Sequence, residues 1–198
     1  STPKKTSPKR LFWICALLFV LIVAGGGCGF ISATLSNLPD VSNVRPSASS
    51  QIYDVHGNLI TTVHSSENRL PIPLKDVPKD LQNAFVATED SRFYTHHGID
   101  PIGILRAVWV NIVHSGVSEG GSTITQQLAR NAFLSQDRTL KRKISEALLA
   151  LKIEQHYTKQ EILEMYMNQI YFGQGAYGVQ SAAHVYFGKD VRDLTLAQ

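Results

Sequence analysis

Cysteine is nearly absent from this 198-residue sequence, and so are the metal-binding patterns that depend on cysteine and histidine. Both cysteines, Cys15 and Cys28, lie in one uncharged apolar run near the N-terminal end. The rest of the chain therefore uses no disulfide bond and no thiol chemistry. The adjacent His96 and His97 have no cysteine and no HExxH spacing around them, which argues against a structural zinc site.

The apolar run spans residues 11–31 and contains no charged residue over its 21 positions: LFWICALLFVLIVAGGGCGFI. As a helix it would be roughly 32 Å long, close to the thickness of a bilayer's hydrocarbon core. Four cations and no acid precede it, and the next cation after it is Arg45. The sequence therefore predicts a single transmembrane helix at 11–31, with residues 1–10 as a cytoplasmic tail. A cleaved signal peptide or lipoprotein-type processing at Cys28 are the alternatives.

The part of the chain after this helix has no excess of basic residues. Four of the 19 cations lie in the tail, which leaves 15 cations against 16 acids and a net charge of −1. The sequence pI of about 8.9 is therefore partly a sign of topology, and it does not indicate a nucleic-acid partner.

The remaining chain reads as a linker and one domain. Residues 32–50 are rich in Ser, Pro and Asn, and residues 51–63 predict a β-hairpin around His56-Gly57-Asn58. From Pro78 onward the pattern is mainly helical. Five helices are predicted: 79–89, 122 to about 133 with Ser122 as N-cap, 138 to about 156 capped by Asp137, 158–170 opened by a Thr158–Glu161 capping box, and 179–187 stopped by Gly188. The fold class is thus mainly α, with a small β element at the entrance of a domain over 51–198.

Helical phase separates two neighbouring acids in the first of these helices. The expected apolar face consists of Leu81, Ala84, Phe85 and Thr88, which places Glu89 at its edge and Asp90 toward solvent or its own loop. We therefore expect Glu89 to be partly buried, and burial raises a carboxylate's pKa toward the range useful for proton transfer. The alternative is a structural helix-end acid packed beside Phe85.

The third predicted helix has two faces that could be covered. A core stripe is expected from Leu140, Ile144, Ala147, Leu148 and Leu151. On the opposite side, Arg142 and Glu146 share a face with Leu149 and Ile153, so that face is expected to be covered too. The alternative is an ordinary solvated ion pair.

The second predicted helix carries a polar stripe of Thr123, Gln127 and Arg130. Its start, after Gly120-Gly121, has free N–H groups that suit a phosphate or a sugar oxygen. Paired carboxylates, Glu89 and Glu146, suit a reaction at an anomeric carbon. The cations Arg130, Arg142 and Lys143 suit a phosphate-bearing leaving group. With the membrane helix, these features predict a lipid-linked sugar as substrate.

The loop expected between the first two helices is unusually apolar. Its sequence IDPIGILRAVWVNIVHSGV contains only one cation, Arg106. It is either ordinary core or a lobe that dips into the bilayer with Trp109 at the interface.

The motifs ATEDSRFYTHHGID, GGSTITQQLARN, RKISEALLALKIE and ILEMYMNQIYFGQGAYGVQSAAHVYFGK resemble those of the peptidoglycan glycosyltransferases of family 51, in the same order. The segments QIYDVHGNLI and PLKDVPKDLQNAFVATED are most similar to the N-terminal part of class A penicillin-binding proteins. The resemblance implies a lysozyme-like helical fold with a membrane-dipping jaw at about 94–119. It also implies the bacterial inner membrane, with the catalytic domain on the periplasmic or extracytoplasmic face.

The resemblance further implies polymerisation of lipid II by transfer of an undecaprenyl-pyrophosphate-linked glycan. Glu89 matches the general base, and Glu146 matches a second glutamate that orients the donor or holds a divalent cation such as Mg²⁺ or Mn²⁺; no organic cofactor is implied. Supporting and substrate-binding positions match Asp90, Phe93, His96, Ser122, Thr123, Gln127, Arg130, Asn131, Arg142 and Lys143. The implied partners are the bilayer and proteins of cell-wall synthesis, division or elongation.

The departure from the family is at the end, LTLAQ, where the family continues its helical core. The domain is therefore expected to be incomplete at its C-terminal end. Two rival hypotheses remain: a lytic hydrolase of lysozyme-like fold, and a non-catalytic membrane-anchored scaffold of the cell wall.

Overall fold

The computed structural model describes residues 29, 32–42, 50–56, 59–63, 68–114, 120–135 and 137–198. It divides into two units, Ser1–Pro39 and Asp40–Gln198. In the first unit, residues 32–36 are helical. The predicted transmembrane helix falls outside the described residues apart from Gly29, so it stays a prediction. No helix in the described ranges is both long enough and apolar enough to cross a membrane.

The second unit begins with the small β element that the sequence predicts. Strands β1 (Ser50–Tyr53) and β2 (Leu59–Val63) pair antiparallel, with Ser50 opposite Val63. Strand β3 (Asn68–Arg69) runs parallel to β4 (Ala176–Tyr177) and so joins the segment before the first helix of this unit to the segment between the last two α-helices.

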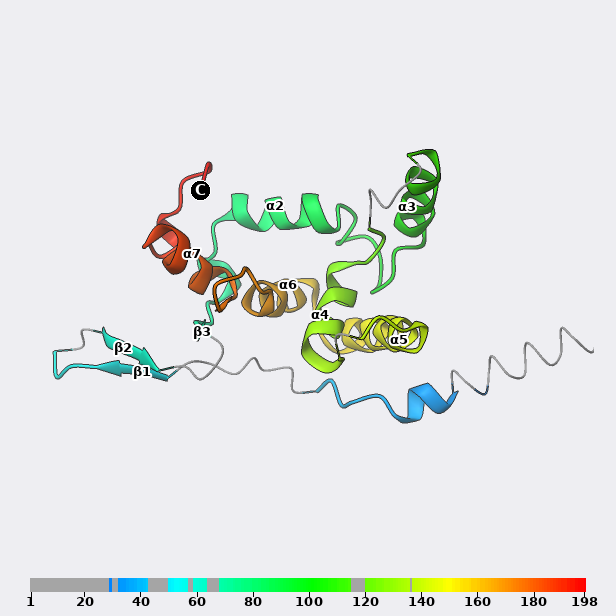
Figure 1. Ribbon diagram of the computed structural model, residues 1–198, viewed down its shortest axis with the longest axis horizontal. Coiled ribbons are helices and arrows are strands. Elements are labelled where there is room, and N and C mark those ends of the chain that lie inside the picture. The colour runs from blue at the N-terminus through cyan, green and yellow to red at the C-terminus, as the bar shows by residue number, and fades with distance from the viewer. Residues whose placement is uncertain are drawn as a thin grey trace, which may run out of the picture. The chain divides into compact units, whose positions relative to one another are not determined.

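Helices make up most of the second unit (Figure 1). In chain order they are η1 (Leu74–Asp76), α2 (Lys79–Glu89), α3 (Pro101–Val113), α4 (Ile124–Phe133), α5 (Leu140–His156), α6 (Lys159–Gln169), α7 (Val179–Phe187) and η2 (Val191–Asp193). The predicted capping box of Thr158 and Glu161 opens α6, and Gly188, with a left-handed φ of 63°, ends α7. The predictions for these two helices and for α2 are confirmed.

The N-caps of α4 and α5 differ from the prediction. Thr123 and Thr139 accept hydrogen bonds from the backbone N–H groups of the residues three positions on, so both helices begin after these threonines. Ser122 and Asp137, the predicted caps, lie outside the helices. Ser, Thr and Asp are all suitable N-cap residues, so residue type alone does not show which of two candidates caps a helix. Here the threonine closer to the first helical turn takes the position.

The core forms where α4 packs against both α5 and α6. The predicted stripe of α6 is confirmed, because Ile162, Leu163 and Tyr166 are fully buried. The predicted stripe of α5 is wrong: Leu140 is 77% exposed, whereas the face with Glu146, Leu149 and Ile153 is fully buried. Helix α5 therefore turns its mixed face to α4, and the choice between two apolar faces depends on the partner helix.

The buried side of α2 also differs from the expected one. Gln82 is buried, while Ala84 and Thr88 are exposed. The Gln82 amide donates to the carbonyl oxygens of Leu74 and Val77, both at 2.9 Å. The Gln82 side chain thus holds the start of α2 against η1 by donating to carbonyl groups in and just after η1. Apolar periodicity does not predict a buried polar residue of this kind.

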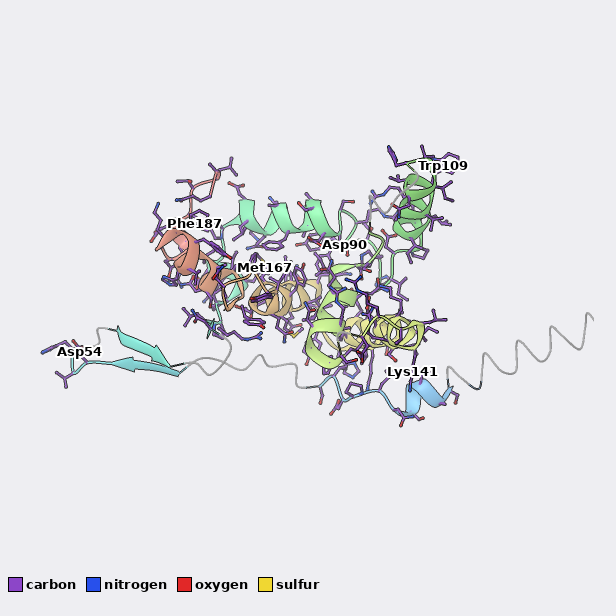
Figure 2. All side chains as sticks on the ribbon, viewed as in Figure 1. Asp54, Asp90, Trp109, Lys141, Met167 and Phe187 are labelled. Carbon is purple, nitrogen blue, oxygen red and sulfur yellow. The ribbon has the colours of Figure 1, made fainter. Side chains whose placement is uncertain are left out.

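The apolar segment expected to be a loop is the helix α3. Asp100 stands at its N-cap position and Pro101 at its first turn, and only Gly103 and Ala107 are buried. Exposed apolar residues cover the rest of the helix: Ile102, Ile104, Leu105, Val108, Trp109, Ile112 and Val113. Figure 2 shows Trp109 on the part of α3 that projects away from α4 and α5.

Gly98 is required where the loop before α3 crosses α5. Its φ is +87°, and a Cβ there would lie 2.9 Å from the backbone carbon and oxygen of Ala150. We expect Gly98→Ala to lower the free energy of unfolding by about 2 kcal/mol or more, from backbone strain plus a clash that cannot relax. Urea unfolding measures this.

Gly188→Ala is the matched control, because Gly188 has φ +63° but open space around its Cβ position. It should cost only roughly 1 kcal/mol, the strain alone. Equal losses for the two variants would show that the contact with Ala150 contributes nothing.

Candidate active site

A cleft of about 530 Å³ lies where the C-terminal end of α2 meets α3 and the start of α4. The lining residues used below are Glu89, Asp90, Arg106, Ser122, Gln127 and Arg130. The cleft therefore combines residues from separate predicted motifs with Arg106 of the apolar helix. Figure 2 shows Asp90 at this junction between α2 and α4.

Glu89 is the last residue of α2, and its carboxylate is exposed in the cleft. The Gln127 Nε2 donates to Glu89 Oε2 at 2.8 Å. Among the described residues no other hydrogen bond to Glu89 is present, so Oε1 has no protein donor, and Glu89 itself lines the cleft. The expectation of partial burial is wrong, but the carboxylate is accessible and held by one amide.

Asp90 is the buried acid of the pair, with only 7% of its surface exposed. Of the two predicted orientations, the one toward solvent is wrong and the one toward its own loop agrees with the contact to His96, because Asp90 is the C-cap of α2, with φ −160°, and no longer follows the helical phase. Its carboxylate accepts hydrogen bonds from His96 Nε2 at 2.9 Å and from the backbone N–H of Ile124 at 3.0 Å. Asp90 thus ties the end of α2 to the first turn of α4.

Two N–H groups at the start of α4, those of Ile124 and Gln126, are used by the protein itself. Asp90 takes that of Ile124, and the Thr123 hydroxyl takes that of Gln126. The Thr123 hydroxyl also donates to the carbonyl oxygen of Gly98 at 2.6 Å. The Thr123 hydroxyl therefore serves the fold, and the predicted ligand contacts at this helix start stay a prediction.

Phe93 and His96 support the same turn from below the cleft. Phe93 is fully buried, its ring packs edge-to-face with that of His96, and Lys159 Nζ lies 4.5 Å from the Phe93 ring centre. Neither residue lines the cleft. In the structure both residues pack beneath the turn that carries Asp90, and their predicted role toward a substrate stays a prediction.

Glu146 is fully buried and held by two cations. Its Oε2 accepts from Arg142 at 2.8 Å, and its Oε1 accepts from Lys143 Nζ. The same Lys143 Nζ donates at 2.7 Å to Ser122 Oγ, and Ser122 lines the cleft. The paired carboxylates suggested by the sequence therefore do not share this cleft: Glu89 lines it, whereas Glu146 is connected to it through Lys143 and Ser122.

The predicted cation near Glu146 finds a poor set of ligands here. Both Glu146 oxygens are already bound by positively charged groups. Across the described ranges, no group of three His, Cys, Asp or Glu side chains lies close enough to hold a metal ion. These residues do not fit a divalent cation, and no step below uses one.

Two arginines give the cleft its positive charge. Arg130, the end of the predicted polar stripe, lines the cleft together with Arg106. Arg106 was not among the predicted site residues; as the only cation in a run of exposed apolar residues, it could have been flagged. Asn131 was predicted, but it is exposed and does not line this cleft.

Tyr166 is the second residue that the sequence pattern missed. Its hydroxyl donates to Gln127 Oε1 at 3.2 Å, although it was expected only as part of the α6 core stripe. Burial, and then the nearby charge of Glu89, raise the pKa of Tyr166 well above its usual range, while Arg130 opposes this shift. A tyrosine on a buried stripe needs a partner for its hydroxyl, and that need is a usable signal.

The comparisons with known proteins agree with the resemblance of the motifs. The family model described as Transglycosylase matches residues 56–198. Penicillin-binding protein 1A of Escherichia coli (strain K12) is 50% identical over 190 residues, which cover 94% of this chain and 22% of that protein. Penicillin-binding protein 1F of Bacillus subtilis (strain 168) is 44% identical over 196 residues, covering 98% of this chain and 27% of that protein.

The chain thus spans about a quarter of the length of these two relatives, and the family model covers most of the chain. The matched range contains all the residues that line the cleft. The chain belongs to the transglycosylase family, the family 51 peptidoglycan glycosyltransferases that its motifs resemble.

Proposed function

We propose that this domain polymerises lipid II into the β-1,4 glycan strands of peptidoglycan, with Glu89 as the general base. The observation that carries the proposal is the exposed Glu89 carboxylate, held by Gln127 in a cleft that also contains Arg106 and Arg130. A base and two cations in one cleft suit an acceptor hydroxyl and a phosphorylated donor.

In the proposed step, Glu89 Oε1 takes the proton of the 4-hydroxyl of lipid II. The hydroxyl oxygen forms a bond with the anomeric carbon of the growing glycan. The bond from that carbon to the pyrophosphate oxygen breaks, and undecaprenyl pyrophosphate leaves with the electron pair. Attack from the face opposite the leaving group inverts an α-linked donor to a β bond. Such an attack requires the acceptor hydroxyl and the leaving pyrophosphate to lie on opposite sides of the anomeric carbon.

The cations would act on the leaving group. Arg130 and Arg106 line the cleft with Glu89, and Lys143 reaches its edge at Ser122. A pyrophosphate gains negative charge as its bond to the sugar breaks, and fixed cations stabilise that charge more than the ground state. The buried Glu146 would keep Arg142 and Lys143 at this edge.

The apolar surface of α3 supports the proposal that the domain works at a membrane. Exposed Leu105, Trp109 and Ile112 lie on the helix that carries Arg106. A helix of this composition can insert into the bilayer interface, where a lipid-linked substrate is held. Anchoring by the predicted helix 11–31 in the inner membrane, and contact with division or elongation proteins, belong to the same proposal.

A lytic hydrolase is the rival function, and it would not need Arg106 and Arg130 in the cleft. The test incubates the detergent-solubilised protein with radiolabelled lipid II and, separately, with purified sacculi. We expect polymer from lipid II and no soluble fragments from sacculi. Release of fragments without polymer formation would overturn the proposal.

Arg130→Ala sharpens the same test. Because a hydrogen bond to a charged group contributes about 1.5–3 kcal/mol, we expect kcat/KM for lipid II to fall roughly 10- to 100-fold. Arg138→Ala is the matched control, since Arg138 is exposed and does not line this cleft. If the two variants had equal activity, Arg130 would not stabilise the leaving group.

A further inference from the structure

Tyr166 lies in the core and yet ends at the cleft. Its side chain is fully buried on α6, whereas its hydroxyl reaches Gln127, whose amide reaches Glu89. Tyr166 does not line the cleft and is connected to the proposed base only through this chain of hydrogen bonds.

Three helices meet around the Tyr166 ring. The Phe85 ring packs edge-to-face on it, with ring centres 6.0 Å apart and an angle of 83° between the planes. Phe85 lies one turn before Glu89 on α2, so both residues lie on the same side of that helix. The Tyr166 hydroxyl then connects α6 to Gln127 of α4 at 3.2 Å. Tyr166 thus fixes α2 and α4 against each other at the base.

The hydrogen bonds also fix which way the Gln127 amide points. An ionised carboxylate can only accept, so the amide nitrogen must face Glu89 and the amide oxygen must face Tyr166. The Tyr166 hydroxyl is then the donor. If that donor is lost, the half-buried amide oxygen has no partner there, so the amide is held by Glu89 alone and can rotate out of that contact toward another donor.

We propose that Tyr166 is a positioning residue that orients the Gln127 amide and thereby leaves Glu89 Oε1 as the oxygen that takes the proton. This inference rests on the proposed function of Glu89 as base. Tyr166 itself does not line the cleft, so it acts only through Gln127.

The tyrosine is suited to this role at every working pH. Burial raises the pKa of Tyr166, and the charge of Glu89 raises it further, so the hydroxyl keeps its proton and remains a donor. A group that titrated near neutral pH would release the amide.

The experiment is a double-mutant cycle with Tyr166→Phe and Gln127→Ala, measured with lipid II in detergent. Phenylalanine keeps the ring packed on Phe85 and removes only the hydroxyl. We expect Tyr166→Phe to lower kcat about tenfold with KM changed less than about twofold, and to have no further effect in the Gln127→Ala background. Tyr186→Phe is the control, because its hydroxyl donates at 2.7 Å to the Phe172 carbonyl, outside the cleft.

Additive effects of the two substitutions would overturn the inference, as would a Tyr166→Phe variant that behaves like Tyr186→Phe. A crystal structure of Tyr166→Phe gives a readout that does not need activity. The inference requires that Gln127 Nε2 leave hydrogen-bond distance of Glu89 Oε2, and an unchanged contact would overturn it. Failure of the proposed function looks different: the unsubstituted protein would then form no polymer from lipid II.

Discussion

Glu89→Gln is expected to reduce the rate of lipid II polymerisation by about 10³-fold, because a general base contributes roughly 10²–10⁴-fold. Glutamine has the same shape, and its amide oxygen can still accept the hydrogen bond that Gln127 donates to Glu89 Oε2. The substitution therefore removes the base and leaves the surrounding contacts intact. The rate of polymer formation from labelled lipid II measures the effect.

Asp80→Asn is the matched control, since Asp80 is an exposed carboxylate at the other end of the same helix. Its activity should equal that of the unsubstituted protein, and both variants should melt within about 2 °C of it. If Glu89→Gln kept more than a tenth of the activity while polymer still formed, another group would have to be the base.

Glu146→Ala is expected to have the largest effect on stability. It leaves Arg142, whose side chain is 16% exposed, and Lys143, which is 44% exposed, without the fully buried carboxylate between them. Removing one member of a buried ion pair costs about 3–5 kcal/mol. Because Lys143 is partly solvated, we expect a loss of about 3 kcal/mol in the free energy of unfolding, measured in urea.

The comparison is Arg192→Ala, which breaks the exposed ion pair with Asp76, where the two side chains are 54% and 31% exposed. A surface pair of this kind contributes about 0–1 kcal/mol. If both substitutions cost the same, the burial of Glu146 would not be what makes its cluster important.

Local signals predicted those elements whose determinants are close together in the chain. The capping box of Thr158 and Glu161 needs only four residues, and Gly188 ends α7 by its own backbone conformation. The start of α3 carries the same kind of signal, in Asp100 and Pro101, so this helix was predictable from its sequence although its apolar composition also suits a loop.

Burial depended on partners that the local pattern does not contain. Helical phase made Glu89 the buried acid, but Asp90 leaves the helix and turns toward Ile124, which is distant in sequence. On α5, two apolar faces were available, and the position of α4 selected the one with Glu146. Motif resemblance selected residues from several elements, of which Glu89, Gln127 and Arg130 line one cleft, whereas their division into cleft-lining and supporting groups required the structure.

The exposed apolar surface of α3 has a consequence for the colloidal behaviour of the domain. Leu105, Trp109 and Ile112 are each more than two-thirds exposed on one short helix. In water without an amphiphile, two copies can cover these side chains only by meeting through them, so the domain would self-associate at the helix that borders its own cleft. Detergent or lipid that covers α3 would then keep the cleft open as well as keep the protein in solution.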